Sequence, residues 1–143
     1  MDKLDIVTDE SGNEVVLLPE IIFSNKQNIN WNDVEDYLGK YVGELIEIAE
    51  TRDIIYIGNK FPDEYGGSSY TRKTKGARAK AKANAAQGIR EMVEIATDKV
   101  YRENHKEKHS EDAHNGWFYY VTRFAIPLYN NEKKTGEYNV YSA

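Results

Sequence analysis

All three histidines of the chain lie within ten residues, at His105, His109 and His114. Imidazole is the side chain that titrates nearest to neutral pH, so this cluster is suited to taking up and releasing protons. His105 and His109 are four residues apart and would share one face of a helix. Two histidines at this spacing beside a carboxylate also fit a metal site, and the same stretch fits a solvated polar helix. Since no His-Glu-x-x-His motif is present, we expect neither a metal ion nor another cofactor.

Positive charge is concentrated in one segment. Residues 65–90 contain no Asp or Glu and carry +7, whereas the remainder of the chain carries −12, which gives the net charge of −5. Such a segment is typical either of a solvated helix face or of a surface that binds anions such as phosphates. The residues that we expect to bind phosphate or nucleic acid are Arg72, Lys73, Lys75, Arg78 and Lys82.

Aromatic residues gather between positions 117 and 129, a stretch that predicts one long strand. On a strand, Trp117 and Tyr119 face one way, whereas Phe118 and Tyr120 face the other. One face has to belong to the core. The other face is either covered by protein as well or free to stack nucleobases.

These three features together match the needs of RNA cleavage without a metal. A base takes the proton of the 2′-hydroxyl, an acid protonates the leaving oxygen, and a cation stabilises the charge on the phosphorane. The chain supplies candidates for each role close together in sequence. The predicted catalytic residues are His105, His109, His114, Tyr120 and Arg123.

The elements that would position these residues follow from the hydrophobic pattern. Turn residues between two β-branched runs predict an N-terminal hairpin. Asn32 and Glu35 look like a capping box for the first helix, and a long alanine-rich apolar stripe predicts the last one. The expected elements are a hairpin at 4–8 and 14–18, a helix at 33–42, a hairpin at 44–50 and 53–58, a loop at 59–75, a helix at 76–99, and strands at 117–129 and 137–142.

This order predicts an α+β fold with two or three helices packed on one face of an antiparallel sheet and an N-terminal hairpin. A chain of 143 residues is long enough for one domain with its own core. We expect residues 1–143 to form a single domain, in which 1–24 is a hairpin or extension and 31–143 is the core. Pro127 is expected at an edge or bulge, and 137–142 at a sheet edge that a second copy could use to form a homodimer.

Composition excludes several classes of protein. Cysteine is absent, so disulfides, Cys-ligated zinc and thiol nucleophiles are excluded. No apolar run reaches the length of a membrane helix, and no secretory signal is visible. We therefore expect a cytoplasmic protein with no membrane partner.

Three segments resemble a known family. The runs at 75–92, 108–117 and 123–128 are similar to domains in large multidomain proteins of phages and bacterial mobile elements. Those domains are grouped with the barnase/EndoU/RelE-like nuclease superfamily, and the similarity covers roughly residues 31–143. It implies a metal-independent, toxin-type RNase scaffold, with an endoribonuclease activity if the chain is an enzyme. The residues that it places at the site are Lys75, Arg78, His109, His114, Tyr120 and Arg123.

The resemblance has one departure, because such domains continue into a further strand where this chain ends at Ala143. A form without that strand could retain the fold and lose catalysis. Two other hypotheses therefore stay open. One is a non-enzymatic phage protein that inhibits a host defence protein through its acidic, tyrosine-rich surface. The other is a structural or assembly domain without an active site.

Overall fold

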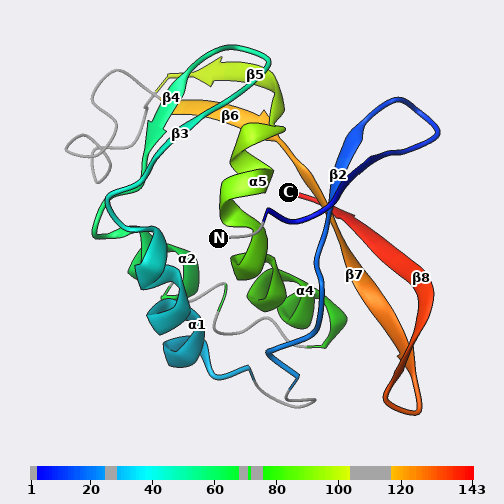
Figure 1. The fold of residues 1–143 in the computed structure, drawn as a ribbon. Coiled ribbons are helices and arrows are strands. Elements are labelled where there is room, and N and C mark those ends of the chain that lie inside the picture. The colour runs from blue at the N-terminus through cyan, green and yellow to red at the C-terminus, as the bar shows by residue number, and fades with distance from the viewer. Residues whose placement is uncertain (1–2, 25–28, 68–70, 72–75, 104–116) are drawn as a thin grey trace.

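The computed structural model describes residues 3–24, 29–67, 71, 76–103 and 117–143 (Figure 1). No helix among these residues is long and apolar enough to cross a membrane. The elements, in chain order, are β1 (Ile6–Thr8), β2 (Glu14–Leu17), α1 (Trp31–Leu38), the 3-10 turn η1 (Gly39–Tyr41), β3 (Leu45–Glu47), β4 (Ile54–Tyr56), α2 (Phe61–Gly66), α4 (Ala77–Ala85), the 3-10 turn η2 (Ala86–Gly88), α5 (Ile89–Glu94), β5 (Thr97–Arg102), β6 (Trp117–Val121), β7 (Arg123–Asn130) and β8 (Lys133–Ser142).

The predicted α+β class and the N-terminal hairpin are confirmed. The described strands form three separate sheets, whereas the sequence predicted one antiparallel sheet. The largest has the order β1-β2-β7-β8, and the other two are the ribbons β3–β4 and β5–β6. Strand β2 runs parallel to β7. The connection between them, residues 18–122, is long enough for the crossover that a parallel pair needs. The N-terminal hairpin is thus paired into the main sheet.

Helix α1 begins earlier than the predicted capping box. Asn30 is the N-cap, and its side chain accepts hydrogen bonds from the backbone N–H groups of Asn32 (3.1 Å) and Asp33 (3.4 Å). The apolar stripe of the helix therefore starts at Trp31 and includes Val34 and Leu38, all buried. Trp31, the first helical residue, shares a core cluster with Val34 and Leu38, so the apolar face of the helix includes a residue that precedes the predicted start.

The predicted helix at 76–99 is divided into α4, η2 and α5, and residues 97–102 are a strand instead. The division falls where the chain passes close to the main sheet. A Cβ at Gly88 would lie 3.2 Å from the Leu18 side chain and 3.3 Å from that of Val16. The Gln87 side chain also donates a hydrogen bond to the Glu20 carbonyl. Close packing of this turn against the N-terminal segment therefore interrupts the helix.

The alanine-rich helix α4 is buried on two sides. Ala79 and Ala83 belong to a core cluster with α1, whereas Ala81 and Ala85 belong to a second cluster with Phe124 of the main sheet. Small side chains are needed on both sides, because the helix lies between two layers at short distance. The apolar stripe that predicted this helix is therefore buried in its middle portion, which includes Ala81 and Ala85.

Two further expectations about connections were wrong. The predicted loop at 59–75 contains helix α2, whose second residue, Pro62, lies in the first helical turn, where proline is tolerated. The predicted turn at 130–136 is much shorter, because strand β8 already begins at Lys133. Asn131 and Glu132 have φ values of 50° and 69°, the left-handed geometry of a two-residue hairpin turn.

The predicted strand at 117–129 is two strands that belong to different sheets. Thr122 separates β6 from β7, and its hydroxyl donates a hydrogen bond of 2.7 Å to the Met92 carbonyl at the end of α5. This contact lies where the chain leaves one sheet for the other. The expected irregularity at Pro127 is confirmed, since the β7–β8 register shifts between Pro127 and Tyr129.

We predict that Asn84→Ala destabilises the protein strongly. Asn84 is fully buried in α4, and its side chain accepts from the N–H groups of Ile22 (2.8 Å) and Phe23 (3.1 Å) and donates to the Phe23 carbonyl. Alanine leaves these backbone groups without partners, so the free energy of unfolding should fall by about 2–4 kcal/mol. Urea denaturation measures the loss. Asn59→Ala, at an exposed turn, is the control and should change stability by less than about 0.5 kcal/mol.

Candidate functional site

The two strands of the β5–β6 ribbon expose aromatic side chains on both faces. The register pairs Tyr101 with Phe118 and Val100 with Tyr119, so each pair shares one face. All four side chains are about half exposed, between 49% and 56%. Exposure of this extent on both faces is unusual for aromatic residues in a ribbon that belongs only to a folding core.

A cation lies beside the aromatic side chains on each face of the ribbon. The Lys99 Nζ is 4.4 Å from the Phe118 ring centroid, and the Arg102 guanidinium is 5.4 Å from that of Tyr119. These distances are within the range of cation–π attraction. The Tyr119 face therefore presents an apolar ring next to the positive charge of Arg102, whereas the charge of Lys99 beside Phe118 is paired with the Asp53 carboxylate.

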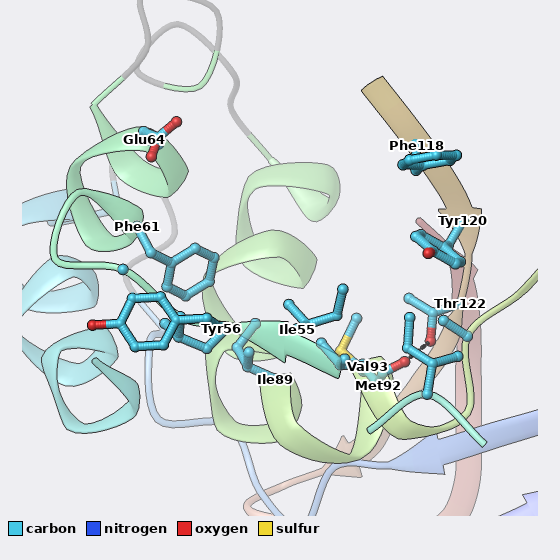
Figure 2. Close-up of a pocket in the computed structure, with 14 residues that line it drawn as sticks. Ile55, Tyr56, Phe61, Glu64, Ile89, Met92, Val93, Phe118, Tyr120 and Thr122 are labelled. Atoms are coloured by element: carbon cyan, nitrogen blue, oxygen red, sulfur yellow. Dashed lines mark hydrogen bonds between the residues drawn. The ribbon is translucent and has the colours of Figure 1, made fainter. Parts of the chain in front are cut away.

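An apolar groove lies beside one face of this ribbon. Figure 2 shows Phe61 of α2 on one side and Phe118 of β6 on the other, with Ile55, Met92 and Val93 between them. The cavity has a volume of about 480 Å³. Its lining combines both ribbons and two helices, so it exists only in the tertiary structure. The lining residues are Ile48, Ile55, Tyr56, Ile57, Gly58, Phe61, Glu64, Ile89, Met92, Val93, Ala96, Phe118, Tyr120 and Thr122.

The polar end of the groove is organised by the Asp53 carboxylate. One oxygen, Oδ2, accepts three hydrogen bonds of 2.8 Å each, from Thr51 Oγ1, Lys99 Nζ and the Tyr120 hydroxyl. The bond from Lys99, followed by those from Tyr120 and Thr51, lowers the pKa of Asp53 to about 2. The same ion pair raises the pKa of Lys99. Asp53 therefore remains an anion and Lys99 a cation at neutral pH.

Tyr120 connects the groove with this polar cluster, because its ring lines the cavity and its hydroxyl bonds to Asp53. Burial, and then the hydrogen bond to Asp53, raise the pKa of Tyr120 above its ordinary value. The phenol is therefore protonated at neutral pH, with its proton directed at the Asp53 carboxylate. In this arrangement the hydroxyl serves to hold β6 against the β3–β4 hairpin.

The other predicted site residues lie apart from the groove or outside the described residues. Arg78 is exposed near the start of α4, and Arg123 is half-buried at the start of β7. Lys82 of α4 donates to the Thr71 hydroxyl at 2.7 Å and lies 5.0 Å from the Tyr65 ring centroid. Outside the described residues lie His105, His109, His114, Arg72, Lys73 and Lys75.

Burial lowers the pKa of Lys82. Among the described residues, no hydrogen bond or ion pair joins Tyr120 to Arg123, Arg78 or Lys82, and none of these three cations lines the groove. The structure thus brings Tyr120 together with Asp53 and Lys99, two residues that sequence reasoning did not single out. Nothing in the spacing of Asp53, Lys99 and Tyr120 indicates their meeting, because they come from the β3–β4 turn, from β5 and from β6, which are far apart in the chain.

Comparison with known proteins identified no relative of this chain. No family model matches the chain, and neither a curated protein nor a solved structure matches it.

We predict that the Asp53 cluster stabilises the fold in a pH-dependent manner. The pKa of Asp53 is about 2 in the folded protein and 3.8 ordinarily, so its contribution is present above about pH 4 and is lost as the pH falls to about 2. In Asp53→Asn this contribution is absent at every pH. The difference in unfolding free energy between wild type and variant, measured by urea denaturation, should therefore shrink between about pH 4 and pH 2. A difference that does not vary with pH would contradict the assignment.

Proposed function

We propose that this protein binds single-stranded RNA across the β5–β6 ribbon. The observation that carries the proposal is the exposed Tyr119 ring with the Arg102 guanidinium beside it, on the face of the ribbon that also exposes Val100. Proteins that bind single strands stack bases on aromatic side chains and hold the phosphates with neighbouring Lys or Arg. The Tyr119 face has both components, whereas Lys99 on the Phe118 face is paired with Asp53, so Arg102 is the cation that we assign to a phosphate.

The chain topology supports a link between this surface and RNA cleavage. Arg102 and Trp117 are paired at the end of the ribbon, and residues 103–116, which join them in sequence, contain all three histidines. Because this segment joins the two strands of the proposed RNA-binding ribbon, the proposal includes metal-independent cleavage of the bound RNA by His105, His109 and His114. The resemblance to phage and mobile-element nuclease-like domains points to the same class of activity, with the cytoplasm of a bacterial host as the site of action.

We predict that Tyr119→Ala weakens RNA binding by about 5- to 100-fold, the effect of losing one base–aromatic stack. Arg102→Gln should also reduce the slope of log affinity against log salt by about 0.7, because one phosphate contact is lost. Fluorescence anisotropy with a labelled single-stranded RNA measures both effects. Tyr129→Ala is the matched control, since Tyr129 is also exposed (41%) but lies on β7.

The same samples test cleavage when the RNA is run on a denaturing gel with and without EDTA. The proposal expects products in both conditions for wild type and none for the variant with His105, His109 and His114 changed to Ala. Binding without cleavage would limit the function to RNA binding. Equal affinities for Tyr119→Ala and Tyr129→Ala, or no binding by wild type at low salt, would refute the RNA surface.

The apolar groove favours a second candidate function, the inhibition of a host protein by binding to it. Beside the groove, the β3–β4 hairpin exposes Leu45 (64%), Ile54 (58%) and Tyr56 (64%). The register places Leu45 opposite Tyr56 on one face of that hairpin. Exposed apolar side chains next to an apolar cavity are typical of protein interfaces, in which tyrosine and methionine are enriched.

For this second function we predict that Tyr56→Glu abolishes recovery of a stoichiometric partner from host lysate, because a carboxylate would be buried against apolar surface. Tyr119→Ala, on the outward face of the other ribbon, should leave that recovery unchanged. Recovery that is insensitive to Tyr56→Glu, or the absence of any partner with wild type, would count against a groove-mediated interaction.

A further inference from the structure

The outer edge of the main sheet is a ten-residue strand, β8, which pairs with β7 alone among the described strands. Figure 1 shows β8 at the side of the sheet opposite the β1–β2 hairpin, away from the helices. Its residues 133–140 are all exposed. Such an edge is a template for a further strand unless charges, proline or a bulge protect it.

The hydrogen bonds of the sheet determine which β8 residues offer backbone groups to a partner. Thr122 and Ala143 exchange both N–H···O bonds, each 2.9 Å, and form a hydrogen-bonded pair. Alternation along an antiparallel ladder then makes Ala125–Val140 and Pro127–Tyr138 non-hydrogen-bonded pairs. The Ala125 carbonyl indeed points the other way, to the N–H of Leu18. The N–H and C=O groups of Tyr138, Val140 and Ser142 therefore point outward.

Two of these three residues, Tyr138 and Val140, also have apolar and exposed side chains. Tyr138 is 38% exposed and Val140 is 57% exposed, and the two share one face because they are two residues apart on a strand. At the start of the strand, Lys134 is held back, since its Nζ donates to the Pro19 carbonyl. The regular part of the edge is 138–142, because the β7–β8 register shifts between Lys134 and Tyr138 and Gly136 has a φ of 88°. These five residues contain no charged side chain and no proline.

We propose that a second copy of this chain pairs its β8 antiparallel to this edge, with Asn139 opposite Asn139 of the second copy. This register places Tyr138 opposite Val140 of the second copy and Val140 opposite its Tyr138. Both are hydrogen-bonded pairs with outward backbone groups, and an aromatic residue opposite a β-branched one is a favourable cross-strand pair. Residues 138–142 carry no charge, so no like charges face each other in this register. The dimer joins two four-stranded sheets into one continuous sheet.

The absence of cysteine from the chain permits a direct test of the register. In the proposed dimer, the Cα atoms of the two Asn139 residues are about 4.5 Å apart, as in other non-hydrogen-bonded pairs. Disulfides need a separation of roughly 4.4–6.8 Å. Asn139→Cys should therefore form a covalent dimer of twice 16.5 kDa under mild oxidation. Glu137→Cys, exposed two residues earlier on the same strand, is the matched control and should not form the disulfide-linked dimer.

Light scattering of the unmodified protein at rising concentration provides the second measurement. We expect a dimer, and we expect Val140→Pro to remain monomeric, because proline removes an outward N–H without breaking a bond to β7. Val140→Lys should give the same result if proline disturbs the strand. A monodisperse monomer for wild type, or crosslinking of Glu137→Cys as fast as that of Asn139→Cys, would overturn the proposal.

Discussion

The convergence of three hydrogen-bond donors on one oxygen of Asp53 is the contact on which the candidate site depends. The donors come from the β3–β4 turn, from β5 and from β6. Each of these ribbons has only two strands, and an isolated two-stranded ribbon is marginally stable in water. The cluster joins the β3–β4 turn to the β5–β6 ribbon, and Tyr120, one of its donors, also lines the groove. Charge-assisted hydrogen bonds are suited to joining two marginal ribbons, because bonds to an ionised acceptor are shorter and stronger than bonds between neutral groups.

The separation of β6 from β7 has the largest consequence for the architecture. A single strand at 117–129 would have placed its aromatic side chains in one sheet, with one face in the core. The turn of the chain at Thr122, anchored on the end of α5, places Phe124 in the main core and leaves Tyr119 exposed. One aromatic segment therefore packs in the core with its second half and exposes side chains with its first half.

The two candidate functions use different parts of the same region. The rings and cations of the β5–β6 ribbon favour a nucleic-acid strand, whereas the apolar groove favours a protein side chain. Phe118 belongs to both surfaces, since it lines the groove and lies beneath Lys99. A ligand on one surface would therefore compete with a ligand on the other at this residue.

The sequence by itself determined the features that depend on local pattern: the α+β class, both N-terminal hairpins, the alanine-rich buried helix and the irregularity at Pro127. Each follows from spacing or from backbone chemistry within a few residues, which neighbours in the chain impose on each other. Only the tertiary structure decided the break at Gly88, the parallel pairing of β2 with β7 and the meeting of Asp53, Lys99 and Tyr120. These depend on contacts between residues 46 (Asp53 with Lys99) to 108 (Val16 with Phe124) positions apart in the chain. No spacing rule encodes such contacts, because they arise from how complete elements fill a shared core.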